Sequence, residues 1–131
     1  MLHAISVKDY MAGDLITFKP DMDVLDAIHL LLQHRISGAP VVDNLGNIVG
    51  MLSEVDCIQV ALTSSYYEEK GGKVEEYMSR NVKTVDADAS LVDVAEMFLK
   101  DPYRRYPVVD DNRLVGQISR RDVLRALEEL W

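Results

Sequence analysis

The sequence predicts a mixed α/β fold built from two copies of one β-α-β-β-α motif. Two observations carry this prediction. The stretch Val41–Asp56 reads VVDNLGNIVGMLSEVD, and Val108–Asp122 repeats it as VVDDNRLVGQISRRD. The repeat also extends toward the N-terminus, because Val7 and Val74 are equivalent and lie 67 positions apart. Past the turn the offset falls to 66, and a one-residue deletion is best tolerated in a turn.

Size and composition narrow the possible functions. The chain has 131 residues, which suits one compact module, and its net charge of −8 disfavours a nucleic-acid partner. Cys57 is the only cysteine, so neither an intramolecular disulfide nor a thiolate metal cage is expected. The three histidines do not form a metal set, and no apolar run reads as a signal peptide or a membrane span. We therefore expect a reduced, cytoplasmic protein without a metal and away from membranes.

Each copy begins with a short helix and a brief strand, followed by an amphipathic helix. The short helix is expected at 6–11 and 74–78, and the strand at 15–18 and 82–85. Asp23 and Ser90 are the expected N-caps of the amphipathic helices. Apolar residues at i, i+3 and i+4 predict their inward faces. The inward residues are Val24, Ala27, Ile28, Leu31 and Leu32 in the first copy and Leu91, Val94, Ala95, Phe98 and Leu99 in the second.

A hairpin and a last helix complete each copy. Its strands start at Pro40 and at Pro107, where the missing N–H of proline costs least. Gly/Asn/Asp-rich turns follow, and the chain returns as NIVGML or RLVGQI. The last helix begins at Ser53 in the first copy and at Ser119 in the second.

The order of elements predicts how the copies assemble. A strand–helix–strand crossover implies parallel pairing, and the tight turn implies an antiparallel hairpin. Two helices on one face leave the other face of the sheet bare, so we expect the copies to pack sheet to sheet with pseudo-twofold symmetry. Gly50 and Gly116 interrupt the returning strands and predict a close backbone neighbour, here the opposite sheet. The single module 1–131 then comprises a first motif at 5–63, a linker at 64–73 and a second motif at 74–131.

These residues resemble the CBS-domain pair, the tandem cystathionine-beta-synthase motif also called a Bateman module. The resemblance rests on ISGAPVVD…NIVGMLSEVD and RRYPVVD…RLVGQISRRD, each placed after an amphipathic helix. It implies a regulatory module that binds AMP, ADP, ATP or S-adenosylmethionine in the cleft between the motifs. It further implies a homodimer that acts on a regulated protein, which the sequence does not identify. We expect no required cofactor and, because no nucleophile–base pair is present, no enzymatic activity.

Adenosine recognition needs an apolar slot, acceptors for the ribose hydroxyls and donors for the phosphates. Ser-x-x-Asp at a helix start offers an acceptor beside free N–H groups. By resemblance, the better cleft combines base, ribose and phosphate residues in that order: Ile16 and Ile36, Ser119 and Asp122, Arg104 and Arg105. The mirror cleft would use Ser37, Ser53, Asp56, Lys83 and Tyr103. Lys83 departs from the family pattern there, because it replaces an apolar wall.

Purely structural roles stay open for the same residues. Each Ser-x-x-Asp can be a capping box. The arginines can pair with surface carboxylates such as Asp101, Asp110 and Asp111. The alternative function is then a module that dimerises and docks on another protein without a ligand. A small nucleotide hydrolase is a third candidate, but no nucleophile–base pair in the sequence supports it.

Overall fold

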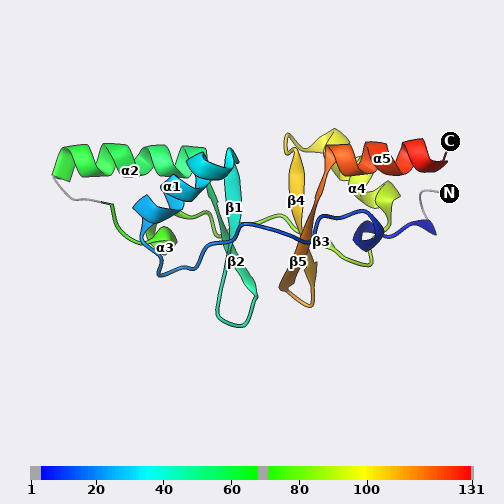
Figure 1. Ribbon diagram of the computed structural model, residues 1–131, viewed down its shortest axis with the longest axis horizontal. Helices are drawn as coiled ribbons and strands as arrows, with labels where there is room; N and C mark the ends of the chain where they lie inside the picture. Colours follow the sequence, from blue (N-terminus) through cyan, green and yellow to red (C-terminus); the bar gives the residue numbers. More distant parts are fainter. Residues whose placement is uncertain (1–3, 68–70, 131) are drawn as a thin grey trace. The chain divides into compact units, whose positions relative to one another are not determined.

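The computed structural model describes residues 4–67 and 71–130, apart from the side chains of 64–67. The mixed α/β class is as predicted (Figure 1). In chain order the elements are a 3-10 helix at Val7–Asp9, α1 (Val24–His34), β1 (Gly38–Val42), β2 (Ile48–Ser53), α2 (Glu54–Tyr67), α3 (Val74–Tyr77), β3 (Val85–Asp86), α4 (Leu91–Lys100), β4 (Arg105–Asp110), β5 (Arg113–Ser119) and α5 (Arg120–Leu130). None of the helices in the described ranges is long and apolar enough to cross a membrane.

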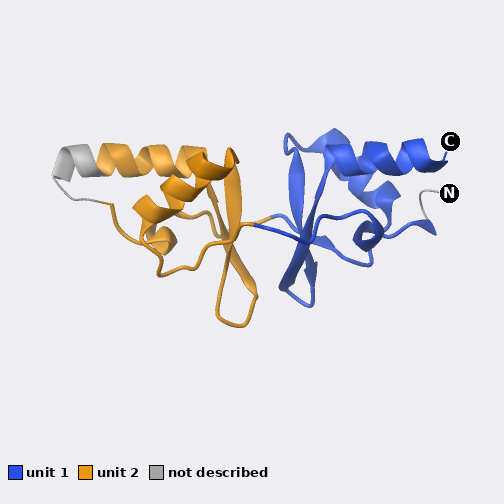
Figure 2. Ribbon diagram, in the orientation of Figure 1, with its two compact units in different colours: residues 1–15, 83–131 blue, residues 16–82 orange. Residues whose placement is uncertain are grey.

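The chain divides into two compact units that do not follow the boundaries of the sequence repeat (Figure 2). Unit 1 comprises residues 1–15 and 83–131, and unit 2 comprises residues 16–82. The leading segment of each motif therefore belongs to the unit built around the other motif. Val7 donates its N–H to Ala89 O at 2.9 Å, and Val74 donates to Met22 O at 2.9 Å. Both valines are fully buried, so each exchanged segment completes a core.

The two hairpins share one register. In unit 2, β1 and β2 pair antiparallel with Gly38 opposite Ser53. In unit 1, β4 and β5 pair antiparallel with Arg105 opposite Ser119, and β3 adds a parallel strand beside β4. Both hairpins also have an irregularity at the equivalent point. Residues that the sequence offsets make equivalent therefore also occupy equivalent positions in the two hairpins. In each unit both long helices lie on the same side of the hairpin (Figure 1).

The prediction of a strand at 15–18 is wrong, because these residues form no strand. Only Phe18 pairs there, through a single parallel bridge to Val41. Its counterpart in unit 1 is β3, which covers Val85 and Asp86 rather than 82–85. The chain passes between units at 15–16 and again at 82–83. Of the segment predicted as a strand in each motif, only the last residue, Phe18 or Val85, pairs with the parallel neighbour.

The long helices begin as predicted but bury less than expected. Asp23 accepts a hydrogen bond from Leu25 N at 2.9 Å, and Ser90 accepts one from Asp93 N at 3.2 Å. Ile28, Ala95 and Phe98 are half-buried, and the following inward residues are buried: Val24, Ala27, Leu31, Leu91 and Val94. Leu32 and Leu99 are not inward, because their exposed fractions are 72% and 88%. Each lies one residue past the core-facing row, a rotation of about 100° around the helix.

Glycines in the returning strands do meet a close backbone, though not the one expected. A Cβ on Gly116 would lie 2.7 Å from Ala12 O, and one on Gly50 would lie 3.0 Å from Ser79 O. Ala12 also exchanges two backbone hydrogen bonds with Gln117, both of 2.9 Å. The neighbour is therefore the extended segment that follows the short helix, within the same unit. The expectation that the opposite sheet causes these glycines is wrong, because an intra-unit contact accounts for both.

Candidate functional site

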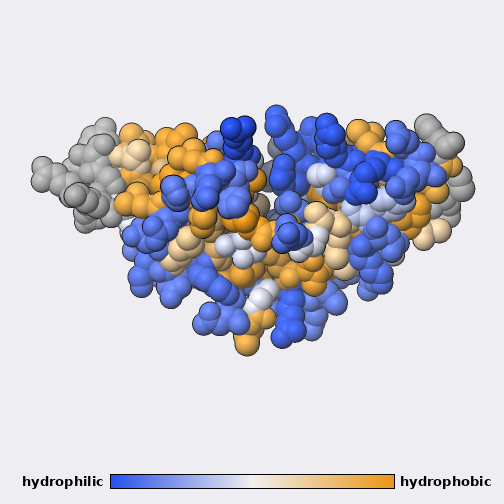
Figure 3. Space-filling view, viewed as in Figure 1, coloured by the Kyte–Doolittle hydropathy of each residue, from blue (hydrophilic) through white to orange (hydrophobic). Residues whose placement is uncertain are grey.

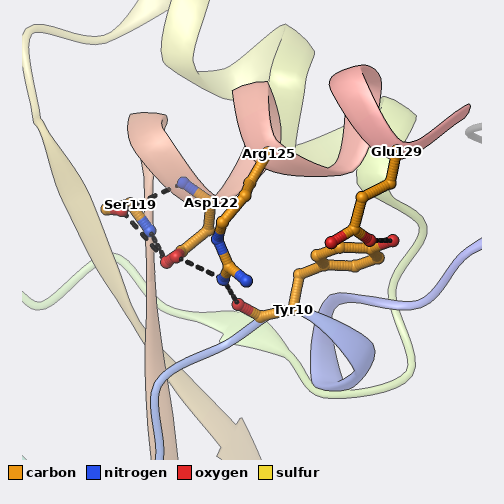
Figure 4. A network of polar contacts seen from close by, with 5 residues as sticks. All are labelled: Tyr10, Ser119, Asp122, Arg125 and Glu129. Atoms are coloured by element: carbon orange, nitrogen blue, oxygen red, sulfur yellow. Dashed lines mark hydrogen bonds and ion pairs between the residues drawn. The ribbon is translucent and has the colours of Figure 1, made fainter. Parts of the chain in front are cut away.

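Ser119 and Asp122 form a reciprocal capping box at the start of α5 (Figure 4). Asp122 Oδ2 accepts from Ser119 N at 2.9 Å and from Ser119 Oγ at 3.0 Å, and Asp122 N donates to Ser119 Oγ at 3.2 Å. The structural role that the sequence left open is thus confirmed. The other carboxylate oxygen, Oδ1, faces the Arg125 guanidinium at 3.0 Å. The cap uses only half of this carboxylate.

The first motif repeats the box without the arginine. Asp56 Oδ2 accepts from Ser53 N at 2.9 Å and from Ser53 Oγ at 3.0 Å, and Asp56 N donates to Ser53 Oγ at 3.3 Å. Three residues after Asp56, at the position of Arg125, stands Gln59. Within the described part of the chain no side chain bonds to Asp56 Oδ1. The two Ser-x-x-Asp motifs therefore share a backbone role and differ in their charge environment.

Backbone hydrogen bonds tie the loop before each hairpin to the start of the following helix. Arg120 N donates to Arg104 O at 3.1 Å, and in unit 2 Glu54 N donates to Ser37 O at 2.9 Å. Arg105 lies opposite Ser119 across the hairpin. Unit 1 therefore brings together four predicted residues: Arg104, Arg105, Ser119 and Asp122. Unit 2 brings together Ser37, Ser53 and Asp56.

The arginines near the α5 start have different roles. Arg104 and Arg105 are exposed, and neither forms an ion pair with any described residue, so the structure does not bear out for them the alternative of pairing with surface carboxylates. Arg120 instead holds the loop, donating from Nε to Tyr103 O at 3.1 Å and from Nη2 to Pro102 O at 3.4 Å. Arg121 lines a groove of about 530 Å³ along α5. The other residues that line it are Ser119, Asp122, Leu124, Arg125 and Glu128.

Arg125 connects this site to the N-terminal segment, which the sequence did not reveal. Its Nη2 donates to Tyr10 O at 3.2 Å, and its guanidinium carbon lies 5.7 Å from the centre of the Tyr10 ring. Tyr10 Oη in turn donates a short hydrogen bond to Glu129, which raises the pKa of the phenol (Figure 4). The spacing of Asp122 and Arg125, i and i+3 on a helix, was a readable signal for the ion pair. Tyr10 left no local signal, because it comes from the exchanged segment.

The predicted base-contacting residues fall in separate units. Ile16 and Ile36 are half-buried and pack against the unit 2 core. Lys83 and Tyr103 belong to unit 1, where Lys83 Nζ lies 2.6 Å from Asp101 Oδ2. The meeting of base residues from one unit with Ser-x-x-Asp residues from the other stays a prediction.

Each unit also exposes an apolar groove between its two long helices. In unit 2 the groove measures about 510 Å³ between α1 and α2, and in unit 1 about 500 Å³ between α4 and α5. Hydrophobic side chains are visible over α2 in Figure 3. Leu32 and Ile58 line the first groove and are 72% and 62% exposed; Leu99 and Leu124 line the second and are 88% and 63% exposed. These pairs are equivalent by the repeat offset, so both units expose the same two positions.

Comparison with known proteins agrees with this geometry. The family model of the CBS domain matches twice, over residues 7–63 and 74–129. The chain is 30% identical over 125 residues to the uncharacterized protein MJ1225 of Methanocaldococcus jannaschii, covering 95% of this chain and 44% of that protein. The chain thus spans less than half the length of that relative.

Two solved structures are similar over nearly the whole chain. The structure of CBSX2 from Arabidopsis thaliana in complex with AMP superposes with a TM-score of 0.82 at 32% identity, covering 95% of this chain and 97% of that one. The CBS-domain pair of protein MJ0100, in complex with 5′-methylthioadenosine and S-adenosyl-L-methionine, gives a TM-score of 0.74 at 30% identity. That match covers 97% of this chain and 98% of the other.

Proposed function

The chain belongs to the CBS-domain family, as a tandem pair, and we propose that it is a regulatory module that binds an adenosine-containing ligand. The similar structures that hold AMP, or 5′-methylthioadenosine and S-adenosylmethionine, support this class of ligand. AMP, ADP, ATP and S-adenosylmethionine are the candidates. We propose that the chain has no catalytic activity of its own and requires no cofactor.

One observation within unit 1 carries the proposal. Arg104 and Arg105 are exposed beside the α5 start, and neither has a carboxylate partner among the described residues. In a chain of net charge −8, such a local excess of guanidinium groups favours an anion. The arginines bind the phosphates, while Asp122 accepts from the ribose hydroxyls. Ile16 and Ile36 form the apolar wall for the base, in the cleft predicted between the two motifs.

Capping and ribose binding are compatible at Asp122. The cap engages Oδ2, whereas Oδ1 faces the exposed side chain of Arg125. A carboxylate oxygen has two lone pairs, so Oδ1 can accept from a ribose hydroxyl while it stays paired with Arg125. Ser119 is held at the site by the same box and adds a hydroxyl. The mirror site with Ser37, Ser53, Asp56, Lys83 and Tyr103 is the weaker candidate, because no arginine pair stands beside it.

We also propose that the chain forms a homodimer through its helical grooves. Equivalent apolar positions are exposed in both units, and contiguous apolar surface of this kind commonly marks an interface. The same observation favours the second candidate function, a ligand-independent module that dimerises and docks on a regulated protein. The single cysteine fits a reducing compartment, and we propose a cytoplasmic location.

Ligand titration separates the two candidates. The purified chain is titrated calorimetrically with AMP, ADP, ATP and S-adenosylmethionine, and its thermal unfolding is followed with each ligand at millimolar concentration. A ligand that binds only the folded chain adds about 2.7 kcal/mol of stability at a hundred times its Kd, so the unfolding temperature should rise. Absence of heat and of any shift with all four ligands rejects the sensor function and leaves the interaction module.

A further inference from the structure

The two motifs differ in chemical character at four positions around the proposed base contacts. The common register fixes this correspondence, because the bridge between Phe18 and Val41 matches the pairing of Val85 with Val108. Up to the hairpin turn, each residue of the first motif is 67 positions before its counterpart. The first motif has Ile16, His34, Ile36 and Ala39, and the second has Lys83, Asp101, Tyr103 and Tyr106.

In the second motif these four residues form one connected cluster. Asp101 Oδ2 accepts from Lys83 Nζ at 2.6 Å and from Tyr106 Oη at 2.8 Å. Both bonds hold the pKa of the Asp101 carboxyl below its usual range, that of Lys83 being the larger cause. Tyr106 is fully buried, and the Tyr103 ring meets it edge-on with centroids 5.9 Å apart. The Lys83 ammonium group and the Tyr103 ring are therefore held at the positions where the first motif has the aliphatic side chains of Ile16 and Ile36.

The first motif has nothing comparable at the same positions. Ala39 is 1% exposed and contributes only a methyl group where the second motif has a phenol. Ile16 and Ile36 pack against the unit 2 core from its edge and remain half-buried. His34 is exposed and bonds to no described side chain. This arrangement leaves aliphatic surface open, as sites for the flat face of a base require.

We infer that each chain takes one adenosine-containing ligand rather than two, with its base on Ile16 and Ile36, and that the Lys83–Asp101–Tyr106 cluster closes the equivalent position of the second motif. The inference rests on the proposed function. A base entering at the cluster would have to separate Lys83 from Asp101 or cover the half-exposed Lys83 ammonium group and remove its water. A donor left without its acceptor costs more than the contact it replaces returns. Both motifs would thus share the fold, but only the first would provide a site for the base.

Stoichiometry tests this directly. Calorimetric titration of the wild-type chain with AMP should give one AMP per chain. Lys83→Ile/Tyr103→Ile gives the second motif the two aliphatic residues of the first and keeps the hydrogen bond between Asp101 and Tyr106. This variant should bind a second AMP, and the single variant Lys83→Ile serves if the double variant does not fold. Ile16→Lys, the reverse change, should weaken AMP binding by more than about tenfold, equal to about 1.4 kcal/mol.

Different experimental results would contradict this inference and the proposed function. Two AMP per wild-type chain would overturn the inference while leaving the function intact. So would an Ile16→Lys variant that binds normally beside a Lys83→Ile variant that loses binding, since the single site would then lie on the second motif. No heat with the wild-type chain or any variant would reject the function itself, and the inference with it. Circular dichroism of each variant establishes that it is folded.

Discussion

Asp122, in the first turn of α5, forms an ion pair of 3.0 Å with Arg125 one turn later, whereas Gln59 stands at the position three residues after the equivalent Asp56. Two motifs that look alike in sequence therefore present different carboxylates. Both aspartates cap their helices through Oδ2. Only Asp122 stands among arginines and is linked through Arg125 to Tyr10 of the exchanged segment. The Ser-x-x-Asp motif therefore caps a helix in both units, but only the Asp122 carboxylate is paired with an arginine.

Asp122→Asn should weaken AMP binding about tenfold or more while leaving the fold intact. The amide oxygen can still accept from Ser119 N, but the negative charge that attracts the ribose hydroxyls is lost. Asp56→Asn is the matched control, because it makes the same change in the other capping box. Calorimetry gives the affinities. Equal losses in the two variants, or a larger loss with Asp56→Asn, would place the ribose in the mirror site.

Arg104→Ala/Arg105→Ala should lower the affinity for ATP more than the affinity for adenosine. The two guanidinium groups have no carboxylate partner among the described residues, so their proposed role is with phosphate. Arg113→Ala is the control, since Arg113 lies at the turn end of the same hairpin. Titrations at two salt concentrations should show a weaker salt dependence for the double variant. A uniform loss for ATP and adenosine would contradict phosphate contacts.

Gly116→Ala should destabilise the chain by about 1–3 kcal/mol, because its Cβ would lie 2.7 Å from Ala12 O. Gly13→Ala provides the comparison: its nearest neighbour is Val115 O at 4.0 Å, and a change within about 0.5 kcal/mol is expected. Urea unfolding of both variants gives the free energies. If both substitutions are equally tolerated, the exchanged segment does not press on β5 as described.

Asp101→Asn should destabilise the chain at neutral pH and much less in acid. Hydrogen bonds from Lys83 and Tyr106 lower the pKa of Asp101 in the folded chain. A lowered folded pKa stabilises above the unfolded value of about 3.9 and loses that contribution as pH falls through the folded pKa. The gap in urea midpoint between wild type and variant should therefore be widest near pH 7 and narrow below about pH 4. A gap that stays constant down to about pH 2.5 would exclude this linkage.

Ile58→Glu should dissociate the proposed homodimer, because it places a charge in the apolar groove of unit 2, where Ile58 is 62% exposed. Leu45→Glu adds the same charge at a residue that is 69% exposed in the β1–β2 turn, outside both grooves. Analytical ultracentrifugation should find the first variant monomeric and the second unchanged. A monomeric wild-type chain, or an Ile58→Glu dimer, would reject the groove as the interface.

Local rules predicted a large share of this molecule. The duplication is visible directly as repeated sequence, and the hairpin register follows from the turn. The N-caps Asp23 and Ser90 and the two capping boxes depend on residues two or three positions apart. Hydrogen bonds from i to i+3 and turn geometry act over that range, so the residues themselves specify them. The family resemblance supplied the candidate residues of unit 1, and the hairpin pairing places Arg105 opposite Ser119.

Tertiary contacts decided what no local pattern encodes. Val7 bonds to Ala89 across 82 positions, and this exchange determines which segment completes each core, why 15–18 barely pairs and what lies against Gly116. The same is true of Leu32 and Leu99, whose helical spacing predicts burial although no element covers them in the described chain. The ion pair between Lys83 and Asp101 joins residues 18 positions apart, and no local pattern predicts it. Sequence specifies periodicity and turns, whereas the partner of each exposed face depends on burial between segments that are distant along the chain.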